Sequence, residues 1–255
     1  MSEQSELQVW QDELEARLSL AHVDAMAIRV YRQTRSTQDI AKTFAPNKAL
    51  IVADQQTAGR GRLGRQWVSK PGASVLMSLC WPTAGMSITH DRVSMLSGLA
   101  VAQAVEIFLP DVEVRLKWPN DVMIEANKLS GILIEAAPGA FMIGIGLNVT
   151  LDAIADAEFA GRATCIEEHG SQADRLDVIT QVVMQLQEVL SDKEPGNLLD
   201  EWRARASLGQ THTFEQAGQR ITGEVVDLDP DHGLIVRRNT GEIITLPAAT
   251  TSVVK

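Results

Sequence analysis

Hydrophobic residues recur at helical spacing in several stretches of the chain. Near the start, apolar residues on one helical face predict an amphipathic helix. These residues are Leu7, Trp10, Leu14 and Leu18. The same period predicts further helices at 91–109, 175–190 and 197–208. Ser36 and Thr37 are residue types that cap a helix, so another helix is expected to begin there.

Short apolar runs bounded by turn residues predict strands. They cover residues 27–31, 49–54, 73–81, 129–136 and 140–149. Residues 112–118 alternate between apolar and charged side chains, as a strand with one buried face does. The apolar positions are Val112, Val114, Leu116 and Trp118, and the charged ones are Glu113, Arg115 and Lys117.

The pattern changes after Leu208, where short strands are separated by "AGQR", "DPDHG" and "NTGE". Such turn sequences at close spacing are hairpin signals. We therefore predict an α+β protein with two parts. Residues 1–208 form a mixed, mostly antiparallel sheet packed with helices, and residues 209–255 form a small β-barrel.

Composition sets limits on the class of protein. The chain has 255 residues, of which 45% are hydrophobic and 22% charged, so it can bury a sizeable core. Its net charge of −10 argues against a general affinity for nucleic acid or anionic membranes. The acidic N-terminal segment lacks the apolar region of a signal peptide, and no apolar run reaches about 18 residues. We expect a cytoplasmic protein.

The cysteines and histidines do not indicate a metal site or a disulfide framework. Cys80 lies inside an apolar run, which predicts a core thiol, and Cys165 is far from it in the sequence. The five histidines form no pattern of metal ligands.

One loop carries unusual chemistry for an acidic chain. "QQTAGRGRLGRQW" begins at Gln55, and residues 59–65 contain three glycines and three arginines. Glycines let a backbone close on a ligand, and arginines bind phosphate or carboxylate. The stretch from Gln55 to Gly72 thus suits a loop that becomes ordered around an anionic small molecule. A solvated linker is the alternative.

Other unusual residues lie at predicted strand ends. Asn120 and Asp121 follow one strand, and Lys128 precedes another. Gly144 and Gly146 are two apart, hence on one face of a strand, which favours close approach of a flat group. A turn former, an edge lysine and a strand bend are the respective alternatives. Their joint occurrence in one chain favours a binding site.

The motifs "GRGRLGRQW", "KWPNDV", "KLSGILIE" and "GIGLNV" occur in this order, and with them the chain resembles biotin protein ligases. The resemblance covers Val30 to Val149, and the C-terminal part more weakly. It implies a catalytic domain like those of class II synthetases and biotin or lipoate ligases, with an SH3-like barrel. Biotin and ATP, with Mg²⁺, would give biotinyl-adenylate, and a lysine of a biotin carboxyl carrier protein would then accept the biotin.

The resemblance also implies roles for single residues. Lys128, Arg62 and Asp121 would be catalytic, with Asp121 in contact with Mg²⁺. Gln38 stands where the family usually has asparagine. The implied biotin contacts are Ser36, Thr37, Gln38, Gln56, Gly59, Arg60, Gly61, Arg62, Lys128, Gly131, Gly144 and Gly146. The implied contacts of ATP and the adenylate are Arg60, Arg62, Arg65, Trp67, Asn120, Lys128 and Asn148.

Two other functions remain open from the sequence. A lipoate or octanoate ligase would use the same fold, and a nucleic-acid-binding protein would use the arginine-glycine loop on single strands. About 26 residues precede the first predicted strand, so we expect a form without the N-terminal DNA-binding domain of some relatives, and no DNA binding. Sheet-edge homodimers are common in the family, which leaves the oligomeric state open.

Overall fold

A seven-stranded mixed sheet forms the main body of the protein. The computed structural model describes residues 3–84, 88–156, 159, 161–191 and 196–254. The strand order is β1-β2-β3-β7-β6-β5-β4. Only β1 and β2 pair in parallel, and the other pairs are antiparallel. The bounds are β1 Ala27–Thr34, β2 Ala49–Gln56, β3 Ser74–Pro82, β4 Val114–Lys117, β5 Asp121–Ile124, β6 Asn127–Ala137 and β7 Ala140–Asn148.

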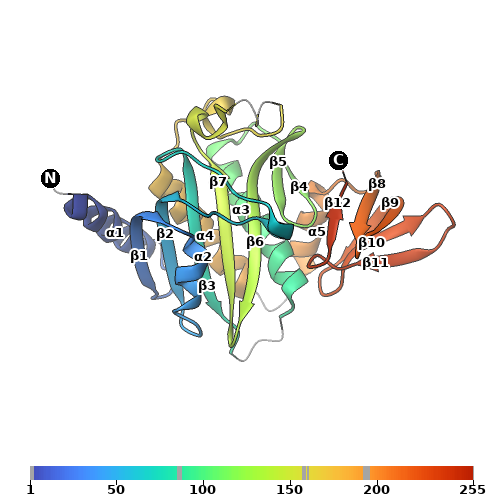
Figure 1. The fold of residues 1–255 in the computed structure, drawn as a ribbon, viewed down its shortest axis with the longest axis horizontal. Coiled ribbons are helices and arrows are strands. Elements are labelled where there is room, and N and C mark those ends of the chain that lie inside the picture. The colour runs from blue at the N-terminus through green and yellow to red at the C-terminus, as the bar shows by residue number, and fades with distance from the viewer. Residues whose placement is uncertain (1–2, 85–87, 157–158, 160, 192–195, 255) are drawn as a thin grey trace.

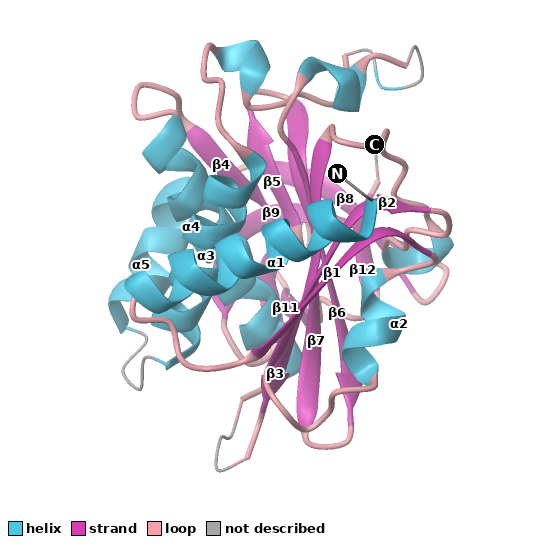
Figure 2. Ribbon diagram, turned by 90° about the vertical axis from the view of Figure 1, so that its left-hand side faces the viewer, coloured by secondary structure: helices cyan, strands magenta, loops and turns pink. Residues whose placement is uncertain are grey.

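Helices cover the sheet unequally (Figure 2). Four of the described helices lie on one face, with α3 and α4 packed together against the sheet, and the short α2 lies on the other. The bounds are α1 Glu3–Leu20, α2 Thr37–Lys42, α3 His90–Phe108, α4 Arg175–Ser191 and α5 Gly196–Arg205. Helix α3 has a buried apolar face, and Thr89 caps its start, with a hydroxyl that accepts from the Arg92 amide at 3.2 Å. The thin cover leaves part of the α2 face open for a pocket.

A second, five-stranded antiparallel sheet lies at the C-terminal end of the molecule (Figure 1). Its order is β11-β10-β9-β8-β12. The bounds are β8 Thr211–Gln216, β9 Gln219–Asp229, β10 Gly233–Arg238, β11 Ile243–Leu246 and β12 Thr251–Val253. The ring of Phe214 packs edge-on against Trp118 at 6.3 Å, so the small sheet shares a core with the main one. The predicted fold class is confirmed; the division at residue 208 stays a prediction.

The strand ends differ from the prediction where polar residues pair. Strands β1 and β2 run on to Thr34 and Gln56, because Gln33 pairs with Gln55 in register and their side-chain amides bond at 2.7 Å. The pattern of apolar residues cannot show where such a strand ends, because its last paired residues are polar. Strand β4 is shorter than the alternating segment, since its ladder with β5 has four residue pairs, and only Leu116 adds a bridge on the other side, to Ala206.

Asp121 of the "KWPND" motif and Lys128 of the "KLSG" motif both lie inside strands, whereas Trp118 to Asn120 form the turn between β4 and β5. Asp121 begins β5 and pairs with Lys117 rather than merely forming a turn. Lys128 lies within β6 instead of before it, because it pairs with Met123 of β5, and a parallel bridge to Ala163 adds a second support there. The amide of Lys128 donates to Arg162, and its carbonyl accepts from Thr164, each at 3.0 Å. Both side chains are therefore held on regular backbone.

No helix in the described ranges is long and apolar enough to cross a membrane. The two cysteines are both free and fully buried. Burial raises the pKa of the Cys80 thiol from 9.0 to about 11, and burial also raises that of Cys165. Cys80 is thus the core thiol that its apolar segment predicts.

We expect both thiols to be inert in the native protein at pH 8, because the reactive thiolate is not populated there. A disulfide reagent should label two cysteines only after unfolding in guanidinium chloride. Since the folded state keeps Cys80 neutral, its contribution to stability is present below pH 9.0 and is lost as the pH rises towards about 11. Rapid labelling of the native protein would contradict this assignment.

Candidate functional site

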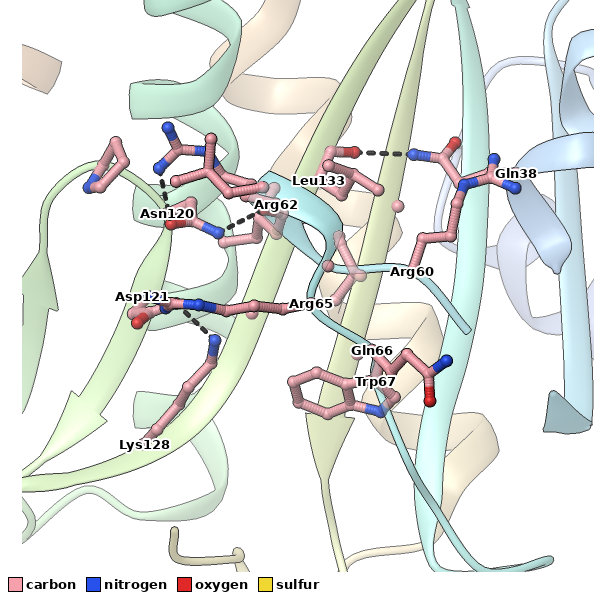
Figure 3. Close-up of a pocket in the computed structure, with 18 of the residues that line it drawn as sticks. Gln38, Arg60, Arg62, Arg65, Gln66, Trp67, Asn120, Asp121, Lys128 and Leu133 are labelled. Atoms are coloured by element: carbon pink, nitrogen blue, oxygen red, sulfur yellow. Dashed lines mark hydrogen bonds and ion pairs between the residues drawn. The ribbon is translucent and has the colours of Figure 1, made fainter. Parts of the chain in front are cut away.

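A pocket opens on the α2 face of the main sheet, between the arginine-glycine loop and β4 to β7 (Figure 3). The loop is less irregular than its composition predicts, since it contains a 3-10 turn at Arg62–Gly64 and a β-bridge between Arg60 and Gln66. The predicted site residues that line the pocket are Ser36, Thr37, Gln38, Gln56, Arg60, Gly61, Arg62, Arg65, Trp67, Asn120, Asp121, Lys128, Gly131, Gly144 and Gly146.

Three glycines on neighbouring strands form the floor. Gly131 on β6 pairs in register with Gly146 on β7, and Gly144 lies two residues along. A Cβ at Gly131 would lie 2.7 Å from Lys128 Nζ, and one at Gly144 would lie 2.7 Å from Gln38 Nε2. A Cβ at Gly146 would overlap the indole of Trp67. The missing side chains therefore let three other side chains lie directly on the sheet.

One end of the pocket is positively charged. Lys128 Nζ lies 2.6 Å from Asp121 Oδ1 and 5.6 Å from the centre of the Trp67 ring. Arg65 extends towards Asp121 in Figure 3. Asp121 is the only carboxylate among the lining residues, and no group of three metal-ligating side chains occurs in the part of the chain that the structure describes. A Mg²⁺ ion that keeps its waters and phosphate ligands fits one carboxylate, whereas a metal held only by protein does not.

Arg62 is held by neutral acceptors. Its Nη1 donates to Asn120 Oδ1 at 3.2 Å, and its Nη2 donates to the carbonyls of Ala248 and, at 2.8 Å, Thr251. Burial lowers the pKa of Arg62, and the negative charges of Asp121 and Asp91 offset this only in part. No carboxylate forms an ion pair with Arg62 within the described residues. Its charge is therefore available to an anion in the pocket.

Arg60 is bound differently. Its guanidinium contacts Asp39 of α2 at 2.6 Å and Glu135 of β6 at 3.1 Å. Burial by itself would lower the pKa of Arg60, but hydrogen bonds to these two carboxylates raise it. Glu135 also pairs with Lys42 at 2.7 Å. Arg60 thus fastens the loop to α2 and β6, and its charge is already compensated.

The pocket lining also contains polar atoms with unused hydrogen-bonding capacity. Among the described residues, four buried lining atoms lack a partner, namely Ser36 Oγ, Gln38 Oε1, Arg60 Nε and Trp67 Nε1. Ser36 stands at the N-cap of α2, but its hydroxyl makes no capping bond, contrary to the prediction. Buried polar groups without partners are rare in folded proteins, so these atoms indicate a ligand with uncharged polar groups.

Thr37 and Gln56 support the wall of the pocket that contains Ser36 and Gln38. The Thr37 amide and hydroxyl donate to Gln56 Oε1 at 2.8 and 3.2 Å, and the hydroxyl also bonds Ser78 Oγ at 2.7 Å. Gln38 Nε2 donates to the Leu133 carbonyl at 2.8 Å, which fixes the side chain over Gly144. The longer glutamine is therefore accommodated where the resemblance leads one to expect asparagine.

Two predicted residues do not line the pocket. Gly59 shapes the loop instead, since its carbonyl accepts from the Trp67 amide at 3.0 Å and a Cβ there would overlap the Trp67 carbonyl. Asn148 is buried, and its Nδ2 donates to the Thr164 carbonyl at 3.0 Å. Its amide thus joins β7 to the segment that supports Lys128.

Several lining residues were absent from the sequence prediction. Lys117 had a usable signal, since it lies on the polar face of an alternating segment beside "WPND". The C-terminal residues had none, because they reach the pocket only through packing of the second sheet. The added residues are Leu63, Gln66, Met77, Lys117, Trp118, Pro119, Ile132, Leu133, Ile145, Ser252 and Val253.

Comparisons with known proteins agree on one family. Residues 29–152 match the model of the biotin/lipoate A/B protein ligase family. The biotin–[acetyl-CoA-carboxylase] ligase of Mycobacterium tuberculosis is 32% identical over 207 residues, which cover 78% of this chain and 76% of that protein. A bifunctional ligase/repressor of Bacillus spizizenii is 35% identical over 159 residues, which are 59% of this chain but only 48% of that protein.

A solved structure extends the likeness to the whole fold. The biotin protein ligase from Aquifex aeolicus, in complex with biotin and ATP, has a TM-score of 0.80 and 28% sequence identity. The match covers 90% of this chain and 99% of that one. It therefore includes the second sheet as well as the first.

We expect Asn148→Ala to lower the free energy of unfolding by about 1–3 kcal/mol, because the Thr164 carbonyl would lose its buried donor. Urea unfolding of the purified variant measures this. Thr213→Ala, which removes an exposed hydroxyl contact with Thr222 in the second sheet, is the control and should shift stability within about 0.5 kcal/mol. Equal stability of the two variants would show that Asn148 has no structural role.

Proposed function

We propose that this chain, which belongs to the biotin/lipoate A/B protein ligase family, is a biotin protein ligase that uses ATP to attach biotin to a carrier-protein lysine. One observation supports this above all. The pocket joins a wall with uncharged polar atoms, at Ser36 and Gln38, to an end lined by Lys128, Arg62 and Arg65. An elongated ligand with a neutral polar head and an anionic tail fits that polarity.

The uncharged end suits the head of biotin. Its ureido group carries both N–H donors and a carbonyl acceptor, and no charge. Gln38 Oε1 would accept an N–H, and the Ser36 hydroxyl would donate to or accept from the ring. The apolar valeryl chain would lie along the indole of Trp67, which itself rests directly on Gly146. The head and tail then define one direction of binding, with the carboxylate towards Lys128.

The charged end suits the first chemical step. A biotin carboxylate oxygen attacks the α-phosphorus of ATP, the bond to the β-phosphate oxygen breaks, and pyrophosphate leaves. Both reactants are negative, so the cations lower the barrier by offsetting their repulsion. Lys128 is preorganised by Asp121, and Arg62 has only neutral partners, so both can face the phosphate. Mg²⁺ would enter with ATP, and Asp121 would hold it directly or through water molecules bound to the metal.

The second step needs an amine and a dry site. The lysine amine of the carrier protein attacks the acyl carbon of biotinyl-adenylate, and AMP leaves with the electrons of the acyl–oxygen bond. The anhydride must survive until then, so the loop excludes water from it. The ion pairs of Arg60 with Asp39 and Glu135 keep the loop over the pocket. We further propose that the protein acts in the cytoplasm and does not bind DNA, in line with its net charge of −10.

The direct test is incubation of the protein with biotin, Mg-ATP and an apo carrier domain, followed by intact-mass measurement of the carrier. We expect one biotin on one lysine, and no modification without ATP. Lipoate and octanoate, offered in parallel, should not be transferred. Transfer of lipoate but not biotin would instead identify a lipoate ligase on the same fold.

We expect Lys128→Gln to slow adenylate formation about a hundred- to a thousand-fold, because one preorganised cation at a developing charge contributes about 3–4 kcal/mol. Pyrophosphate release measures the rate. Glutamine keeps much of the length and some hydrogen bonding, so the change isolates the charge.

The matched control is Lys42→Gln. Lys42 also forms a short ion pair with a carboxylate, at 2.7 Å to Glu135, but it does not line the pocket. Both variants should unfold within about 0.5 kcal/mol of the parent. A Lys128→Gln enzyme within about fivefold of the parent rate would show that Lys128 is an ordinary ion-paired surface lysine.

A further inference from the structure

The backbone of Ala248 connects a helix outside the pocket to an arginine inside it. Ala248 lies between β11 and β12 and is 2% exposed. Its amide donates to Asp91 Oδ2 at 3.0 Å, and its carbonyl accepts from Arg62 Nη2. Asp91 and Arg62 thus both bind one residue of the turn between β11 and β12, without a hydrogen bond to each other.

Asp91 is well placed to fix that residue. It lies in the first turn of α3, and its side chain is only 10% exposed. Its other oxygen lies 3.3 Å from Nδ1 of the adjacent His90. A hydrogen bond from an amide to a buried carboxylate is about twice as strong as a neutral one. Asp91 does not line the pocket, so substrate contact does not explain its position.

The turn that Asp91 holds presents both carbonyls that bind Arg62. Thr250 N donates to Pro247 O at 3.4 Å across the turn, and Thr251 begins β12. A guanidinium is a rigid fork, so acceptors on either side of it determine its orientation. If the Ala248 backbone moves, Arg62 loses one of its three hydrogen-bond acceptors, and its guanidinium is no longer held in its orientation towards the pocket.

We propose that Asp91 is a positioning residue for adenylate formation, which holds the Ala248 backbone so that Arg62 faces the α-phosphate. The inference rests on the proposed function, because it assigns Arg62 to that phosphate. It gives the C-terminal sheet a part in the first chemical step, through a contact between residues 186 positions apart in the sequence. Asp91 contributes orientation, and Arg62 contributes the charge.

The chain offers a matched control at the same helix end. Asp231, in the turn between β9 and β10, accepts from Thr89 Oγ1 at 3.2 Å and pairs with Arg92 Nη2. It therefore also ties the C-terminal sheet to the start of α3, but not through Ala248. Loosened docking of the sheet would affect Asp91→Ala and Asp231→Ala alike. A change in the orientation of Arg62 would lower kcat only in Asp91→Ala.

The experiment measures pyrophosphate release with saturating biotin and ATP, and KM for each substrate. We expect Asp91→Ala to lower kcat about tenfold, within the range of about two- to thirtyfold for coupled positions, with KM for biotin unchanged. Asp231→Ala should stay within about twofold. In an Arg62→Ala background, Asp91→Ala should have no further effect on kcat, because the group it positions is gone.

Equal losses in Asp91→Ala and Asp231→Ala, or losses that multiply with that of Arg62→Ala, would overturn the proposal. Thermal melting checks that each variant folds. If Asp91→Ala does not fold, Asp91→Asn takes its place with a weaker, neutral acceptor, and the same dependence on Arg62 decides the matter with a roughly two- to fivefold loss. An inactive parent enzyme would count against the proposed function itself. An active parent together with a fully active Asp91 variant would contradict only the positioning role of Asp91.

Discussion

Close approach to bare backbone is the constraint on which the rest of the site depends. Gly131 and Gly146 face each other across β6 and β7, with Gly144 beside them. Any side chain there would displace Lys128, Trp67 or Gln38 from the sheet. Both strands lie inside the sheet, and at the glycines each is paired with a neighbouring strand on both sides. Their backbone therefore cannot move away to make room for a side chain. The site is therefore rigid where the ligand lies and adjustable only in the loop above it.

The electrostatics of the pocket follow from how each cation is partnered. Arg60 has two carboxylate partners and serves as a fastener, whereas Arg62 has three neutral ones and keeps its charge for the substrate. Lys128 lies between these cases, since it has a single carboxylate that also lines the pocket. Three cations close together in sequence or space thus have different tasks. Since all three side chains are positively charged, the difference between them comes from the groups that each one contacts.

The C-terminal sheet is part of the same design rather than an appendage. Phe214 packs on Trp118 of the "KWPND" motif, and Ser252 and Val253 reach the pocket directly. The carbonyls that orient Arg62 come from this sheet as well. A loop that must close over a reactive anhydride needs rigid support on more than one side. The fold supplies it from α2 and β6 at Arg60 and from the C-terminal sheet at Arg62.

The sequence by itself determined most of the elements, the fold class, the glycine floor and most of the pocket lining, but strand β5 was not predicted. The elements and the fold class depend on local information, namely the period of apolar residues and the turn chemistry, and Gly144 and Gly146 were found from their spacing along a strand. Gly131 and most of the other lining residues came from the resemblance to biotin protein ligases. Only the tertiary structure decided which groups the polar side chains of the site bind. It assigned Arg60 to Asp39 and Glu135, buried Asn148 against Thr164, and brought Ala248 to Arg62 across 186 positions. Long polar side chains have many rotamers and no periodicity, so the acceptor they bind is set by which distant backbone the packing brings within reach.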